Sequence, residues 1–248
     1  QVKNVIEREM RNHIGYDVQI ASIEPKWHIS NPSITIKNFV IFNKNYEQSI
    51  SAKHMEFDFS WLSIIKLSPI LDRVLIDQPN IDIVRNTDDV ISINGIKINS
   101  GNDNSKISNW ILNQDDLIIK NAYVSWQDKK RGDDILVLND VNVNYASSKV
   151  LSFFDRREFF IISNLGEDSI NSLAIKGDIN LDDINNLDAI DGEIEFNLKS
   201  FDLASLAPWI DYPYNINSGS GDLNSVFYLE GGSLKGMKGT IDFNNIVI

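Results

Sequence analysis

Apolar and polar residues alternate along most of the 248-residue chain. In the stretch EPKWHISNPSITIKNFVIF, residues 24–42, Ile34 and Ile36 alternate with Thr35 and Lys37. A period of two gives a β-strand one apolar face and one polar face. The pattern recurs at short intervals, and turn sequences such as NTDD, KKRGDD and EGGS separate the repeats. The sequence therefore predicts a mainly β chain whose strands run antiparallel.

Only a few segments replace this alternation with a helical pattern. Residues 2–14 carry apolar side chains four positions apart and end before Gly15, which predicts an amphipathic N-terminal helix. The other helical segments are short and lie at residues 61–67, 108–114 and 203–210. Together these helices are too small to cover so many strands. The apolar faces must therefore pack on each other, as in a sandwich, or curl around a hollow as one curved sheet.

The best candidate for a boundary is the polar stretch from Asn99 to Lys106. It divides the chain into residues 1–102, with the helix and a first β unit, and residues 103–248, a second unit continuous with the first. The chain begins without methionine and directly in a helical pattern, so we expect a segment of a longer protein. No stretch approaches the roughly 20 apolar residues of a membrane span, so we expect none of these residues to cross a bilayer, and a signal or anchor before Gln1 stays open.

Composition limits the classes of function. The 23 basic and 35 acidic residues give a net charge of -12, which repels nucleic-acid phosphates and anionic lipid headgroups. Cysteine is absent, which fits the periplasm or the cytosol and closes thiol and soft-metal chemistry. We therefore expect no nucleic-acid partner.

Residues that could perform catalysis or bind a metal are scattered. His13, His28 and His54 have no partner at ligand spacing, so we expect no metal site. Adjacent acidic residues such as Asp115 and Asp116 point to opposite faces of a strand, whereas a glycosidase needs two carboxylates facing across a cleft. The glycine-rich stretches lack the strand, loop and helix of a phosphate-binding loop. We predict no catalytic residue and no cofactor, and we set an enzyme aside.

An ordered series of motifs spans nearly the whole chain. YDVQIASIEPKW leads into NPSITIKNFVIF, then FDFSWLSIIKLSPILDRVLIDQPNIDIVR follows, and NWILNQDDLIIKNAYVSWQD ends in a Trp-x-Asp pattern. FDLASLAPWI and the glycine-rich C-terminal stretch complete the order. This series resembles the AsmA-like proteins of Gram-negative envelopes, most closely the large YhdP type. One departure is NTDDVISI, which lacks the Asp-Gly turn that we expect after the Arg85 strand.

The resemblance implies a long, curved β-sheet folded like a trough, a β-groove of the bridge-like lipid transport class. Its concave face is then expected to hold phospholipid acyl chains while lipid moves between the inner and outer membranes, in support of outer-membrane homeostasis. The resemblance also implies a periplasmic location, anchoring in the inner membrane through a helix before Gln1, and envelope protein partners. It implies no cofactor.

The alternating positions on the predicted strands nominate the residues that would line such a groove. Core packing explains each single position equally well, and a β-bulge would move the apolar face by one residue. The candidates are Ile34, Ile36, Phe57, Phe59, Ile76, Ile81, Ile83, Ile119, Val124, Trp126, Val141, Val143, Ile175, Phe196, Leu198 and Phe243.

Two other functions fit the same β pattern. A closed β-sandwich with exposed Trp and Tyr side chains would suit a binding or adhesion module that recognises glycans. Within the resembled superfamily, a TamB-type protein would assist the assembly of outer-membrane proteins. An open, apolar concave face would favour the lipid conduit over the sandwich.

Overall fold

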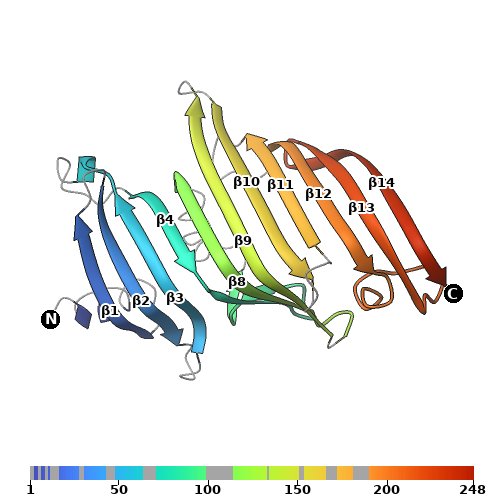
Figure 1. The fold of residues 1–248 in the computed structure, drawn as a ribbon, viewed down its shortest axis with the longest axis horizontal. Coiled ribbons are helices and arrows are strands. Elements are labelled where there is room, and N and C mark those ends of the chain that lie inside the picture. The colour runs from blue at the N-terminus through green and yellow to red at the C-terminus, as the bar shows by residue number, and fades with distance from the viewer. Residues whose placement is uncertain are drawn as a thin grey trace.

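The chain folds into one sheet of 14 strands, shown in Figure 1. The structure is a computed structural model that describes residues 3–4, 7–8, 11, 17–27, 31–42, 48–63, 71–98, 114–132, 134–150, 154–165, 172–180 and 190–248. The strands are β1 (Asp17–Trp27), β2 (Pro32–Phe42), β3 (Gln48–Phe59), β4 (Leu71–Asp77), β5 (Asn80–Arg85), β6 (Ile91–Ile93), β7 (Ile96–Ile98), β8 (Asp116–Asp128), β9 (Ile135–Val150), β10 (Phe154–Leu165), β11 (Ser172–Asn180), β12 (Asp191–Asp202), β13 (Ser218–Glu230) and β14 (Ser233–Val247).

Most neighbouring strands are consecutive in sequence and antiparallel, but β8 runs parallel to β4 and to β5. The strands β4 and β5 resemble one strand interrupted at Gln78 and Pro79, so the first half of β8 pairs with β4 and the second half with β5. After the hairpin of β6 and β7, the chain re-enters the sheet as β8 in the same direction as β4 and β5, which makes both pairs parallel. The sheet is therefore mixed, and the expectation of purely antiparallel strands was wrong.

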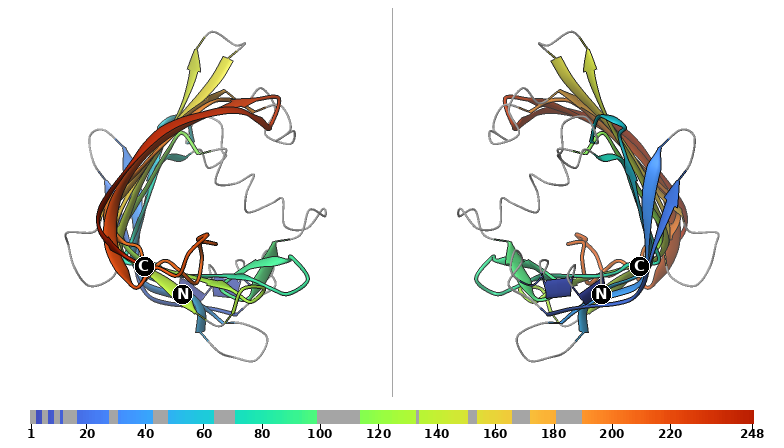
Figure 2. Two further views of the ribbon diagram at one scale, coloured as in Figure 1. Left: turned by 90° about the vertical axis from the view of Figure 1, so that its right-hand side faces the viewer. Right: turned by 90° about the vertical axis from the view of Figure 1, so that its left-hand side faces the viewer.

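The prediction of a mainly β fold with a long, curved sheet is confirmed. Seen along the long axis of the molecule, the ribbon follows an arc around a hollow, as Figure 2 shows. The sheet continues from the strands before residue 99 to those after residue 106, because β8 pairs with both β4 and β5. The described strands belong to one sheet, so this part of the chain holds no second sheet that would complete a sandwich.

The predicted N-terminal helix is not seen, and no helical element is defined among the described residues. Most of residues 2–14 and 108–114 lie outside the described residues, and only residues 61–63 of the segment 61–67 lie within them. The helix predicted for residues 203–210 is replaced by turns.

Proline explains the turns in the last of these segments. The bonds from Ala207 N to Ala204 O and from Trp209 N to Leu206 O span three residues, whereas those from Leu206 N and Ile210 N span the four of an α-helix, so no continuous helical ladder forms. Pro208 lies between Ala207 and Trp209, and proline has no N–H with which to extend a helix. The chain therefore makes tight turns here.

A line of residues with positive backbone φ crosses several strands. Most are Asn or Asp, which adopt the left-handed region more readily than other non-glycine residues. Hydrogen bonds join neighbouring positions: Asn121 Nδ2 donates to Asp77 Oδ1 at 2.9 Å, and Gln78 N donates to Lys120 O at 2.8 Å. We call this line the crease. It consists of Asn38, Gln78, Asn121, Asp140, Ser200 and Asn245.

The crease allows a strand to keep its apolar side chains on one face. Ile36 and Phe39 lie three residues apart, a spacing that puts side chains on opposite faces of a regular strand, yet both belong to one buried cluster. Leu198 and Phe201, on either side of Ser200, share another buried cluster, and the register with β13 shifts between them. A register shift of this kind is a β-bulge, and a β-bulge bends its strand. The crease therefore also contributes to the curvature of the sheet.

The buried core is a lining on one face of the sheet, and it has three clusters. The first cluster contains Val18, Ile20, Ile36 and Phe39. The second contains Val74, Leu117 and Tyr145. The third contains Leu198, Phe201, Leu203 and Leu206.

The Phe159 ring lies over Gly177, its partner on β11. A Cβ atom at residue 177 would lie 2.1 Å from two atoms of that ring. Gly177→Ala should therefore displace the ring and lower the free energy of unfolding by about 1–3 kcal/mol, the usual cost of overpacking. Thermal denaturation followed by circular dichroism measures the loss. Gly236→Ala is the matched control, because its Cβ would meet Tyr228 only at 3.8 Å, and equal losses in both variants would contradict this packing.

Candidate functional site

Two rows of apolar residues cross the sheet from β2 to β14. Residues that are directly paired on neighbouring strands point to the same face of a sheet, so each row lies on one face. The first row is Ile34, Phe57, Val74, Leu117, Tyr145, Phe159, Gly177, Ile194, Phe227 and Met237. The second row is Ile36, Met55, Ile76, Ile119, Val143, Ile161, Ile175, Phe196, Ser225 and Gly239.

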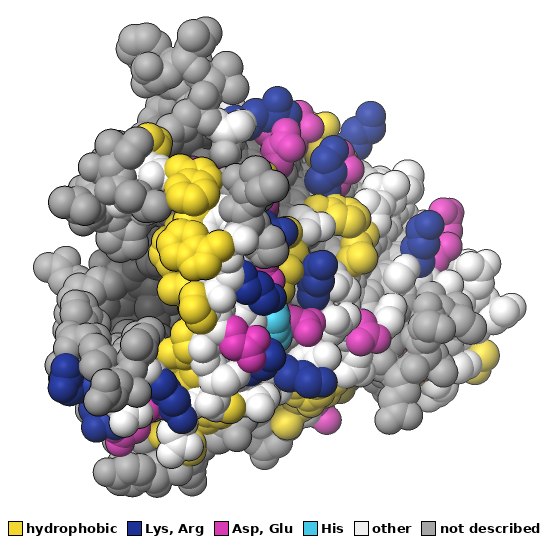
Figure 3. Space-filling model, turned by 60° about the vertical axis from the view of Figure 1, so that its left-hand side comes forward, with side chains coloured by type: hydrophobic (Ala, Val, Ile, Leu, Met, Phe, Trp, Pro, Cys, Tyr) yellow, Lys and Arg dark blue, Asp and Glu magenta, His cyan; other side chains and the backbone are white. Residues whose placement is uncertain are grey.

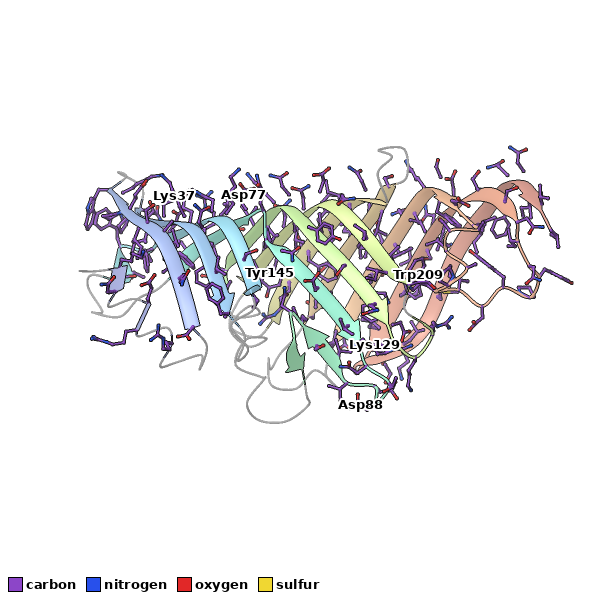
Figure 4. The ribbon with its side chains drawn as sticks, turned by 90° about the horizontal axis from the view of Figure 1, so that it is seen from below. Lys37, Asp77, Asp88, Lys129, Tyr145 and Trp209 are labelled. Carbon is purple, nitrogen blue, oxygen red and sulfur yellow. The ribbon has the colours of Figure 1, made fainter. Side chains whose placement is uncertain are left out.

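Both rows face the hollow of the arc. Residues 203–217, which we call the strap, lie inside the arc in Figure 2, and their buried cluster contacts Phe196 of the second row. In Figure 4, Tyr145 and the strap residue Trp209 lie toward the hollow, whereas Lys37 and Asp77 point away from it. We call the side with the two rows the concave face.

Half of the predicted lining falls within these rows, and the rest pairs beside them. The predicted residues in the rows are Ile34, Ile36, Phe57, Ile76, Ile119, Val143, Ile175 and Phe196. The remaining ones form the pairs Phe59–Leu71, Ile81–Val124, Ile83–Trp126, Val141–Ala122, Leu198–Leu173 and Phe243–Gly221. Contact of any of these side chains with a ligand stays a prediction.

Burial differs among these predicted residues. Val141 and Leu198 are buried, whereas Phe243 on the last strand is 52% exposed. Ile175 and Phe196 are half-buried. The concave face therefore includes positions already covered by protein and positions with apolar area still open.

The opposite, convex face carries ion pairs. Lys37 Nζ lies 2.6 Å from Glu24 Oε1, and this hydrogen bond lowers the pKa of the Glu24 carboxyl. Arg73 contacts Glu56 at 3.2 Å and Asp58 at 2.7 Å. Figure 3 shows this face, with cationic and anionic side chains mixed around a histidine and a band of hydrophobic side chains beside them. The sheet is thus amphipathic, with a mostly charged convex face and a mostly apolar concave face, on which the buried Arg157 donates from Nη1 to the Tyr145 hydroxyl at 2.8 Å.

The strap covers part of the concave face on both sides of the crease, at Leu198 and at Phe201 on β12. Leu203 is 1% exposed and Leu206 is 9% exposed. Trp209, Tyr212 and Ile216 of the strap pack against the same cluster. From the sheet, Leu198 belongs to this cluster. Four further sheet residues pack against it: Leu136, Leu173, Phe196 and Leu223.

Hydrogen bonds hold the strap at both ends and at its middle. Leu203 N donates to Gly219 O at 3.0 Å, and Asn217 N donates to Val247 O at 2.8 Å. At the middle, Arg131 donates from Nη1 and Nη2 to the two carboxylate oxygens of Asp211, at 3.0 and 2.8 Å. This last contact joins the strap to the β8–β9 turn across 80 residues of sequence.

No catalytic or metal-binding arrangement emerges from the described residues. Among them, no three His, Asp or Glu side chains are grouped to hold a metal ion. His54 lies 3.6 Å from Glu56 on the charged convex face, and His13 and His28 lie outside the described residues. In the same part of the chain, no helix is long and apolar enough to cross a bilayer.

The family described as YhdP protein matches the chain over residues 1–247. The chain belongs to the YhdP family. The resemblance found from its ordered motifs is thereby confirmed. No curated protein and no solved structure matches the chain. YhdP proteins form a non-enzymatic envelope family, so membership suggests a lipid-transport-type role and is consistent with a periplasmic location.

The predicted lining leaves out several concave-face residues of this YhdP family member. Leu117 precedes Ile119 by two positions and belongs to the first row, so the period of two was a sufficient signal. Tyr145 stands two positions after Val143 in the same way. The strap had no such signal, because its side chains follow turn geometry and not a strand period.

Leu203 is the strap residue whose loss should cost most. It is fully buried, so Leu203→Ala in the YhdP chain should lower the free energy of unfolding by about 2–5 kcal/mol through lost contacts and a cavity. Urea denaturation measures this change. Tyr214→Ala is the control, since Tyr214 is a strap residue that is 67% exposed; an equal loss there would show that the strap is not packed as described.

The Arg85–Asp128 pair predicts a pH dependence of stability. Arg85 Nε donates to Asp128 Oδ1 at 2.9 Å, and this hydrogen bond holds the pKa of the Asp128 carboxyl below its ordinary value of 3.8. When the pKa of a carboxyl is lower in the folded state than in the unfolded state, its ionised form stabilises the fold at pH values above the unfolded-state pKa. That contribution is lost as the pH falls through the folded-state pKa. Arg85→Leu should therefore destabilise the YhdP chain at neutral pH and much less near pH 3.

Urea denaturation at the two pH values tests this prediction. Arg156→Leu is the matched control, because Arg156 makes a similar pair with Asp178, but both side chains of that pair are more exposed. The control should lose less stability at neutral pH, since exposed pairs contribute little. If Arg85→Leu lowers the free energy of unfolding by the same amount at both pH values, its effect comes from lost packing alone.

Proposed function

We propose that the concave face binds phospholipid acyl chains and conducts phospholipid between the inner and outer membranes of a Gram-negative envelope. One observation carries the proposal: the two rows are apolar from β2 to β14, apart from the Tyr145 hydroxyl and Ser225. The proposal includes a periplasmic location and attachment to the inner membrane, as the family resemblance implies.

The hydrophobic effect supplies the physical reason. Each methylene removed from water gains about 0.8 kcal/mol, so moving a phospholipid acyl chain through water costs on the order of 10 kcal/mol. The rows run across the strands, and neighbouring strands are about 4.8 Å apart. A chain can therefore pass from one side chain to the next without leaving apolar contact. Hydrophobic contact has no direction, so no specific bond has to break at each step.

The other candidate functions have less support. A closed sandwich for adhesion conflicts with the described strands, which form one sheet. A TamB-type role in protein assembly would place a polypeptide, not a lipid, on the concave face. The nature of the bound molecule therefore separates the two envelope functions.

Ile161 and Ile162 offer a matched test, because they are adjacent on β10 and point to opposite faces. Ile161 lies in the second row, whereas Ile162 is 41% exposed on the convex face. The purified wild-type chain should carry phospholipid, measured by native mass spectrometry and lipid extraction. Ile161→Glu should lower the bound lipid about tenfold, because a carboxylate resists transfer to an apolar surface. Ile162→Glu should keep it.

A photo-crosslinking residue at the same two positions keeps the test valid if Ile161→Glu fails to fold. Benzoylphenylalanine at position 161 should crosslink to phospholipid, and at position 162 it should not. A wild-type chain without lipid, or equal effects at both positions, would refute the lipid-binding face. A crosslink from position 161 to a polypeptide instead of a lipid would favour the assembly role.

A further inference from the structure

Two tryptophans and a leucine protrude at one corner of the sheet. Trp27 is 73% exposed, Trp61 is 44% exposed and Leu62 is 48% exposed. The two indole rings contact each other, with centroids 6.4 Å apart and planes tilted by 33°. We call these three residues the tryptophan corner. Side chains this exposed contribute little to folding, so their size and hydrophobicity call for another explanation.

The corner lies at the β1 end of the concave face. Trp27 is the last residue of β1, and Trp61 follows the end of β3 by two residues. β1 lies at one end of the molecule and β14 at the other, as Figure 1 shows. Two residues before Trp27, Pro25 pairs with Ile34, where the first row begins. A lipid that entered at the β1 end would therefore pass beside the corner at the start of the first row.

The charges around the corner suit an anionic surface, although the whole chain carries a net charge of -12. Lys26 is exposed next to Trp27 and forms no ion pair within the described residues. Two nearby carboxylates are paired: Glu24 with Lys37, and Asp58 with Arg73. A third carboxylate, Asp72, accepts a hydrogen bond from Asn31 Nδ2, so the corner presents apolar rings and a cation where only part of the neighbouring acidic charge is paired.

We propose that Trp27, Trp61 and Leu62 insert into the interfacial layer of a phospholipid bilayer, with Lys26 at the headgroups. Indole suits this layer because its ring is apolar and its N–H can stay hydrated. The three side chains protrude at a strand end and a turn, a shape that fits a soft interface better than a rigid protein groove. The inference rests on the proposed function, since the bilayer would be the source or acceptor of the lipid on the concave face.

Vesicle flotation tests the contact. The wild-type chain is mixed with vesicles of phosphatidylethanolamine and phosphatidylglycerol, and the bound fraction is measured. Trp27→Ser combined with Trp61→Ser should lower the partition coefficient about tenfold, equivalent to ~1.4 kcal/mol. The matched control is Tyr214→Ser combined with Leu234→Ser, two side chains that are 67% and 59% exposed outside the corner. The control should bind like the wild type.

Several outcomes would overturn the inference. They are a wild-type chain that does not float, an unchanged partition coefficient in the tryptophan variant, and an equal loss in the control. The second outcome would assign the corner to a protein partner. Trp27→Ser alone, at the more exposed position, should give an intermediate loss with an unchanged melting temperature, which separates the contact from misfolding.

A lipid-loading assay separates this inference from the proposed function. Short-chain phosphatidylglycerol, dispersed below its micellar concentration, reaches the concave face without a bilayer. The tryptophan variant should load this lipid normally, and Ile161→Glu should float with vesicles but fail to load. If no variant and no wild-type chain loads lipid, while flotation still depends on the tryptophans, the proposed function fails and the bilayer contact stands.

Discussion

The structure depends on keeping apolar side chains on the same face of a single sheet from the first strand to the last. Alternation with a period of two achieves this only while each strand is regular, because one extra residue reverses the faces. At the crease, the apolar spacing changes from two residues to three at the same position as the positive φ, as in Ile119–Asn121–Ala122. The spacing of three would by itself move the second apolar side chain to the other face, and the irregular backbone at the positive φ brings it back to the first face. A sheet that bends can therefore keep one continuous hydrophobic face.

The convex face meets a different requirement, since it has to remain in water. Pairs such as Arg73 with Glu56 and Asp58 lie on it, and surface pairs of this kind contribute little to stability. Their value is that mixed charges keep the face hydrated and a net charge of -12 repels other copies of the chain. The continuous apolar rows are therefore confined to the concave face.

The sequence predicted the features that follow from local period, and it missed those that depend on distant partners. The strands and the curved sheet follow from alternation and from the resemblance. The same is true of the common face of Ile36 and Ile76, which both flank Met55 on the second row. The parallel pairing of β8 could not be predicted, because it depends on where the chain re-enters the sheet. The Asn94–Gly95 turn between β6 and β7, with φ values of 50° and 77°, had a strong local signal in its Asn-Gly pair, which the alternation rule does not use.

The strap determines which of the predicted lining residues keep apolar area open. Hydrophobic binding free energy scales with the apolar area removed from water, so a side chain that is already buried has little left to gain. Leu198 is 8% exposed beneath the strap, whereas Ile161, Ile175 and Phe196 on the rows are half-buried. Under the proposed function, the second row on these strands therefore keeps apolar area open for an acyl chain. At Leu198, two residues before the crease residue Ser200, the strap already provides the same contacts from within the protein.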